Sequence, residues 1–211
     1  MGILTEGIFG GFRNKTGPII GRRYRKQNII TSLHRISQKP EQEGELVQQH
    51  RFSILNSFLS RISALVDIGF KQYAKKKSAV NAAYSFNAPH AYINDGEETV
   101  LNYPKLVYSR GQVDTPDFPQ VSFSGEDTIV FSWLPQEQSM YSRANDQASF
   151  LIYIPEKDTA FVLKNEALRA DLSFSVEIKP PVDGATYHCY MNFNNESGKL
   201  VGDSVYVGML T

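Results

Sequence analysis

The sequence predicts an α+β protein with a basic β-hairpin arm, an amphipathic helical segment and an antiparallel β-sandwich. Three observations predict this class. Residues 17–37 combine β-forming residues with a polar turn, residues 45–70 repeat apolar side chains at helical spacing, and the chain after Thr99 alternates apolar and polar residues in short runs. We therefore divide the 211 residues into an arm (1–40), a helical brace (41–97) and a β-sandwich (98–211).

The arm is predicted to form a β-hairpin. Ile19–Tyr24 and Asn28–Leu33 are rich in β-branched and aromatic residues, and a polar turn at Arg25-Lys26-Gln27 separates them. An isolated two-stranded hairpin is only marginally stable in water, so we expect this one to lie on another surface.

Two helices are predicted to follow the arm. Acidic residues after Pro40 suit the positive end of a helix dipole, and the first helix is expected over Glu45–Phe70. A shorter helix is expected over Ser78–Phe86, before Pro89. Apolar residues of the first helix recur at spacings of three and four and indicate one buried face: Phe52, Leu55, Phe58, Leu59, Ile62, Leu65, Val66 and Phe70.

The remaining sequence contains runs that are predicted to be strands. Gly, Pro, Asn and Asp residues separate them, and this regular spacing is typical of a sandwich or barrel. The runs are 99–109, 120–125, 128–135, 148–154, 159–164, 172–178, 187–193 and 203–209.

Part of this segment resembles immunoglobulin-like domains. Residues 183–189, DGATYHC, are similar to the D-x-A-x-Y-x-C signature of their strand F, and Trp133 in TIVFSWLP looks like the tryptophan of fibronectin type III modules. Residues 192–208 resemble the F–G hairpin of those modules. The resemblance covers about Leu101–Met209 and implies a tyrosine corner at Tyr187. The absence of a second cysteine favours the fibronectin-like variant, which lacks the inter-sheet disulfide.

Cys189 is the single cysteine, so the chain cannot form an intramolecular disulfide. Alternation along the predicted strand places it on one face with Tyr187, Met191 and Phe193. A reactive thiol requires an electropositive, exposed setting, so we expect a small buried side chain instead.

Charge is distributed unevenly along the chain. Residues 1–40 hold eight Lys or Arg against Glu6 alone, a net +7, whereas residues 78–211 hold eight against 17 acids, a net −9. This asymmetry predicts that the arm contacts an anionic surface: nucleic acid, lipid, the acidic half of another copy, or its own acidic domain. The candidate assembly or anion-binding residues are Arg22, Arg23, Tyr24, Arg25 and Lys26.

No motif predicts catalysis, a cofactor or a metal site. Lys15-Thr16 lacks both P-loop glycines, because Phe9 and Asn14 occupy their places. The four histidines lack metal-ligand spacing, and no nucleophile motif is present. We therefore expect a protein that is not an enzyme, with no catalytic residue, cofactor, metal ligand or small-molecule substrate.

Targeting and membrane segments are not predicted either. No run approaches 18 apolar residues, and the N-terminus lacks the apolar core of a signal peptide. We expect synthesis in the cytoplasm followed by incorporation into a virion or another assembled extracellular particle, and otherwise a cytoplasmic location.

The N-terminal pattern resembles a domain family of unknown function that is common in Bacteroidota. Its members open with G-x-x-G-P-[IV]-[IV]-G and basic and aromatic residues, followed by a Pro, a Gln/Glu-rich segment and an R-F-x-x-x-x-x-F-L helix. The corresponding residues are Gly17–Tyr24, Pro40–Gln49 and Arg51–Leu59, so the match spans nearly the whole chain. Residues 34–45 depart from it, since members often carry N-P-x-T-x-A-Q there. The resemblance implies no activity.

These observations lead to one functional hypothesis and two alternatives. We expect a non-enzymatic, self-assembling structural protein, a homo-oligomeric virion component or filament subunit whose arm docks onto a neighbouring subunit. The first alternative is an accessory protein that binds nucleic acid or another anion through the basic cluster. The second is an adhesion module that binds carbohydrate or protein through exposed aromatic residues: Tyr92, Tyr103, Phe118 and Tyr141.

Overall fold

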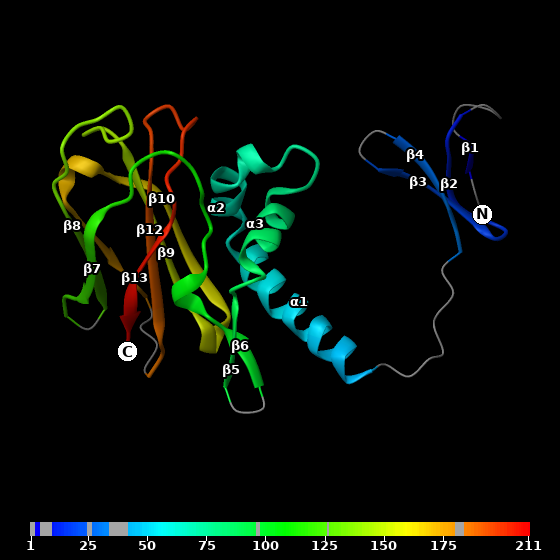
Figure 1. Ribbon diagram of the computed structural model, residues 1–211, viewed down its shortest axis with the longest axis horizontal. Helices are drawn as coiled ribbons and strands as arrows, with labels where there is room; N and C mark the ends of the chain where they lie inside the picture. The colour runs from blue at the N-terminus through cyan, green and yellow to red at the C-terminus, as the bar shows by residue number, and fades with distance from the viewer. Residues whose placement is uncertain are drawn as a thin grey trace. The chain divides into compact units, whose positions relative to one another are not determined.

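The computed structural model describes residues 3–4, 10–24, 27–33, 42–95, 98–125, 127–179 and 184–211. The chain divides into two compact units (Figure 1). The N-terminal unit comprises Met1–Gln42 and the body comprises Glu43–Thr211, and each is described by itself.

The N-terminal unit is a four-stranded antiparallel sheet in the order β1-β2-β3-β4. The predicted hairpin is confirmed, although its second strand starts one residue earlier than expected. Two further strands extend the sheet beyond the hairpin. None of the unit's described side chains is buried. The strands are β1 (Ile3–Leu4), β2 (Phe12–Thr16), β3 (Ile19–Tyr24) and β4 (Gln27–Ser32).

Two glycines allow the β2–β3 hairpin to form. Gly17 has a φ of +59° in the two-residue connection, where a side chain would strain the backbone. At Gly21, a Cβ atom would lie 2.1 Å from the carbonyl oxygen of Phe12. Only glycine therefore permits β2 and β3 to approach this closely.

The body begins with α1 (Glu43–Arg61), α2 (Ser63–Gly69) and α3 (Ala79–Asn87). The expectation of one uninterrupted helix to Phe70 is wrong, because the chain bends at Ile62. The Leu65 N–H donates to the Ile62 carbonyl at 2.9 Å, which tightens the turn to an i→i+3 bond. The apolar face is otherwise as predicted, except that Phe52 is 53% exposed.

A β-sandwich of two antiparallel sheets forms the rest of the body. One sheet has the order β11-β8-β7 and the other has the order β10-β9-β12-β13. Seven strands divided between two antiparallel sheets form an immunoglobulin-like sandwich, so the predicted fold class is confirmed. The strands are β7 (Asp117–Phe123), β8 (Thr128–Leu134), β9 (Gln147–Ile154), β10 (Thr159–Leu168), β11 (Ser173–Glu177), β12 (Tyr187–Asn194) and β13 (Val205–Leu210).

The strand predicted over 99–109 is only partly present. β6 (Glu98–Leu101) pairs with β5 (Tyr92–Asp95) in a separate two-stranded sheet. A 3-10 turn then begins at Tyr103, where Pro104 fixes φ and offers no N–H to a strand ladder.

Aromatic side chains fill the space between the two sheets. Trp133 is buried against Phe150 and Phe193, and its indole N–H donates to the Arg169 carbonyl at 2.9 Å. Cys189 is fully buried in the same core, which confirms its predicted position on the inner face of its strand.

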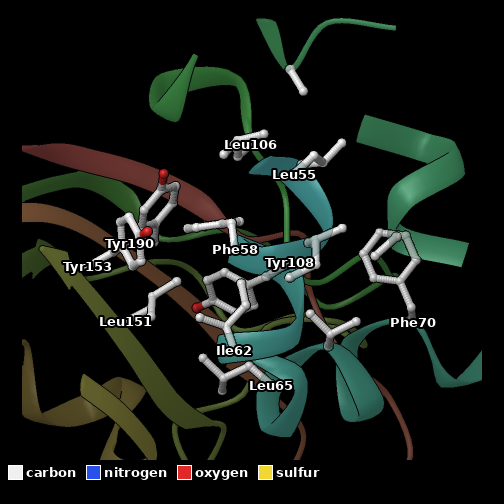
Figure 2. Close-up of a cluster of buried hydrophobic side chains, with 14 of the residues drawn as sticks. Leu55, Phe58, Ile62, Leu65, Phe70, Leu106, Tyr108, Leu151, Tyr153 and Tyr190 are labelled. Atoms are coloured by element: carbon white, nitrogen blue, oxygen red, sulfur yellow. The ribbon is translucent and has the colours of Figure 1, made fainter. Parts of the chain in front are cut away.

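The helices form a third layer on the outer face of the β10-β9-β12-β13 sheet. Figure 2 shows side chains of α1 and α2 meeting Leu151, Tyr153 and Tyr190, which point outward from β9 and β12. Phe58 of α1 stacks edge-on against Tyr153, with ring centroids 4.9 Å apart. Strand β12 is therefore buried on both faces. The alternating pattern of a solvent-facing sandwich strand does not apply to it.

Candidate functional site

Three of the five predicted assembly or anion-binding residues lie on β3 of the N-terminal unit. Arg22, Arg23 and Tyr24 are all exposed, and Tyr24 is 54% accessible to solvent. Successive strand residues face opposite sides, so Arg22 and Tyr24 share one face while Arg23 occupies the other. Arg25 and Lys26 lie outside the described residues, and their part in the site stays a prediction.

The face that carries Arg22 and Tyr24 also carries a second cation. Lys15 on β2 pairs with Ile20 on β3, so its side chain projects to the same side as the side chain of Arg22. Ile29 of β4 is opposite Arg22 and adds a half-buried apolar side chain. This face therefore combines two cations, an aromatic ring and exposed hydrocarbon, which suits an anionic surface of mixed polarity.

The body contains a separate groove of about 460 Å³. One face of α1 lines one side of it, and β6 with the β9–β10 turn lines the other. His50, Ser53 and Ser57 contribute polar groups at helical spacing. Sequence reasoning missed this groove, because its walls come from segments about 50 and 100 residues apart.

The one described carboxylate in this groove is already paired. Arg61 forms an ion pair with Asp158, and the Tyr153 hydroxyl donates to the other carboxylate oxygen at 2.9 Å. Burial and the bond to Asp158 both raise the pKa of Tyr153. Both carboxylate oxygens of Asp158 therefore already have partners within the chain.

His188 is adjacent to the groove and is held neutral. Its ring stacks on Tyr103 with centroids 4.0 Å apart, and its Nδ1 atom is 3.0 Å from the Tyr206 hydroxyl. Burial lowers the pKa of His188 to about 4, although Glu156 acts in the opposite direction. A histidine with such a pKa is a poor general base at pH 7.

The single thiol of the chain is buried. Burial raises the pKa of Cys189 to about 12, so the thiol stays protonated and shielded. Within the described part of the body and arm, no three His, Cys, Asp or Glu side chains group as metal ligands. No described helix is both long and apolar enough to span a bilayer.

The aromatic residues proposed for adhesion do not form one patch. The Tyr92 hydroxyl donates to the Arg51 carbonyl at 2.8 Å, and Tyr103 is occupied by its stack on His188. Phe118 is 76% exposed on β7, and Tyr141 is half-buried in the loop after β8. Two of the four residues therefore serve packing rather than an open binding surface.

Comparisons with known proteins identify similar solved structures and a family. No curated protein was found to match the chain. Among solved structures, the chain is similar to the FN1–FN3 domains of chicken CNTN1, with 13% identity, a TM-score of 0.34, and coverage of 47% of this chain and 32% of that one. It is also similar to the twitchin kinase region of C. elegans, with 14% identity, a TM-score of 0.32, and coverage of 48% and 16%.

The chain thus spans about a third or less of either structure's length. A model of a family of unknown function, DUF6266, matches residues 11–208, which include β2–β4 of the basic sheet and nearly all of the body. The chain therefore belongs to this family.

Proposed function

We propose that this chain is a non-enzymatic structural subunit of a homopolymeric assembly, of the virion or filament type. The N-terminal unit docks onto a neighbouring copy. The observation that carries this proposal is an ordered sheet without a core. The unit buries none of its described side chains, yet Ile30 is 63% exposed and Tyr24 is 54% exposed.

Energetics support an external partner for this sheet. Its strands comprise 19 residues, and ordering each backbone residue costs about 1–2 kcal/mol. Burial of apolar side chains is the main term that offsets this cost, and in the described part of the unit it is only partial, with Ile20 and Ile29 half-buried. A covering surface on another copy supplies that burial.

Charge favours the body of another copy as that surface. Residues 1–42 hold eight basic and two acidic residues, a net +6, and residues 43–211 carry the compensating −6. A contact between two different surfaces of identical chains repeats from copy to copy and builds rings or filaments. Such a contact weakens in salt, because charges more than about 8 Å apart are screened at physiological ionic strength.

Removal of the N-terminal unit tests the proposal. Residues 43–211 contain both buried cores, so we expect this fragment to fold on its own as a monomer. The full chain is expected to form larger species in 50 mM NaCl, and their mass is expected to fall in 500 mM NaCl. Light scattering after size exclusion measures both masses. A full chain with the same monomeric mass as the fragment would overturn the proposal.

Charge reversal identifies the contributing surface. Arg22→Glu with Arg23→Glu is expected to abolish the salt-sensitive species. Lys75→Glu with Lys105→Glu makes the same charge change at exposed positions of the body and is expected to leave them intact. Equal effects of the two pairs would show that net charge, and not the sheet, controls association.

Nucleic acid is the second candidate partner. The shared face of Arg22 and Tyr24 offers a cation for a phosphate and a ring for base stacking. A labelled single-stranded oligonucleotide distinguishes the candidates. Salt-dependent binding that Arg22→Glu abolishes, without self-association of the free chain, would favour the nucleic-acid function.

A further inference from the structure

The N-terminal sheet has two edges, and only one is protected against pairing. β1 forms one edge and is two residues long, and short edge strands are a common protection. β4 forms the other edge with six residues, QNIITS, which include no charge and no proline. Its register with β3 runs without a bulge. β4 therefore lacks the features that normally prevent strand addition.

The hydrogen-bond register determines which groups of β4 face the open edge. The Leu33 N–H donates to the Pro18 carbonyl at 2.7 Å, which continues the β3–β4 ladder by one bonded pair. Bonded and non-bonded pairs alternate along an antiparallel ladder. Ile30, opposite Gly21, is therefore in a non-bonded pair. By the same alternation Asn28, Ile30 and Ser32 direct their N–H and C=O groups away from β3.

We propose that β4 pairs with β4 of a second copy, antiparallel about a two-fold axis at Ile30. This inference rests on the proposed function in one respect, namely that the N-terminal unit makes contacts between copies of the chain. Two-fold pairing must join outward-facing residues to one another. The register with Ile30 opposite Ile30 aligns Asn28 with Ser32 on both sides of the axis, so three bonded pairs form across the seam. A shift by two residues leaves fewer bonded pairs.

Charge explains why β4 pairs with itself. The next two strands of the sheet are basic, with Arg22 and Arg23 on β3 and Arg13 and Lys15 on β2. Pairing through β4 separates the two β3 strands by three strand spacings, about 14 Å. This distance exceeds the screening length of about 8 Å at physiological salt. The uncharged strand thus joins two basic sheets with little repulsion.

Self-pairing also gives the assembly a second kind of contact. A two-fold contact closes on itself and yields a dimer, whereas the contact between sheet and body propagates. The dimer depends on backbone hydrogen bonds and is expected to persist in 500 mM NaCl, where the contact between sheet and body dissociates. The two contacts can therefore be tested separately, the dimer in 500 mM NaCl and the contact between sheet and body by its loss at that salt concentration.

Substitutions at the open edge test the pairing in the full chain. Ile30→Pro removes an N–H that makes no bond to β3, and Ile30→Lys places a charge at the seam. Both are expected to weaken dimerisation at least tenfold in 500 mM NaCl, as measured by sedimentation. Ile19→Lys is the matched control, because Ile19 is exposed on the same face but belongs to the internal strand β3. A monomeric parent chain, or equal effects at both positions, would overturn the proposal.

A cross-link provides an independent measurement. The Cα atoms of a bonded antiparallel pair lie about 5.5 Å apart, within the range of a disulfide. Ile30→Cys is therefore expected to give a covalent dimer on mild oxidation, and Ile19→Cys is not. The native Cys189 is fully buried and does not compete. No cross-link at Ile30, in a chain whose circular dichroism is unchanged, would contradict this register.

Discussion

Replacement of Phe58 by alanine tests whether the helices and the sandwich fold as one unit. Phe58 is 2% exposed, and its ring meets the rings of Tyr153 and Tyr103 with centroids 4.9 and 6.2 Å apart. Removal of a buried phenylalanine ring costs about 3–5 kcal/mol in comparable cores. With a urea dependence of about 2 kcal/mol per molar, the unfolding midpoint is expected to fall by about 1.5–2.5 M.

Two probes report on the two cores in the same experiment. Far-ultraviolet circular dichroism follows the helices, and fluorescence follows Trp133, the single tryptophan, which lies in the inter-sheet core and not beside Phe58. We expect both midpoints to shift together. Phe52→Ala on the same helix is the control, because Phe52 is 53% exposed and its loss is expected to cost less than about 1 kcal/mol. A shift of the helical signal alone would refute one cooperative unit.

Three further predictions concern the body. The pKa of His188 is about 4 in the folded chain and about 6.5 in the unfolded chain, so acidification from pH 7 to pH 4 should lower the free energy of unfolding by up to about 3 kcal/mol. Urea midpoints of the parent and of His188→Gln across this pH range measure the difference. Gly69→Ala places a Cβ 2.5 Å from a backbone oxygen and should destabilise by about 1–3 kcal/mol, whereas Gly44→Ala, with no atom within 4 Å, should raise the melting temperature. Arg169→Ala removes the partner of buried Asp146, with which it forms a 3.1 Å ion pair, and should lower the free energy of unfolding by about 3–5 kcal/mol. The double variant Arg169→Ala with Asp146→Ala should recover part of this loss, and chemical denaturation measures both values.

Local patterns explain why most elements could be predicted. The hairpin of the arm follows from two β-branched runs around a turn, and the sandwich strands follow from alternation and from the residues around Trp133 and Tyr187. The helical apolar face was predicted because spacing of three and four is a property of the chain itself. The bend at Ile62 could not be predicted, because the stripe of apolar residues continues unbroken across it.

The candidate surface in the arm was predicted from the distribution of charge. The placement of its residues on two faces of β3 could also be predicted, because side chains alternate along any strand. The groove beside α1 could not be predicted, because serine, histidine and tyrosine residues of this kind carry no motif. Its walls become adjacent only when α1 packs on the sheet. For the same reason the paired state of Asp158 was hidden, since its partner Arg61 is 97 residues away in the chain.

The sequence by itself determined the order of the elements, the basic character of the arm and the buried state of Cys189, because each depends on residue types and spacings close together in the chain. The tertiary structure alone decided that the helices cover the outer face of the sandwich and bury Tyr190 of β12. It also decided that β4 is the long, uncharged edge of a four-stranded sheet. Burial on a second face and exposure of a strand edge both depend on which segments become neighbours, and a single strand's sequence does not specify its neighbours.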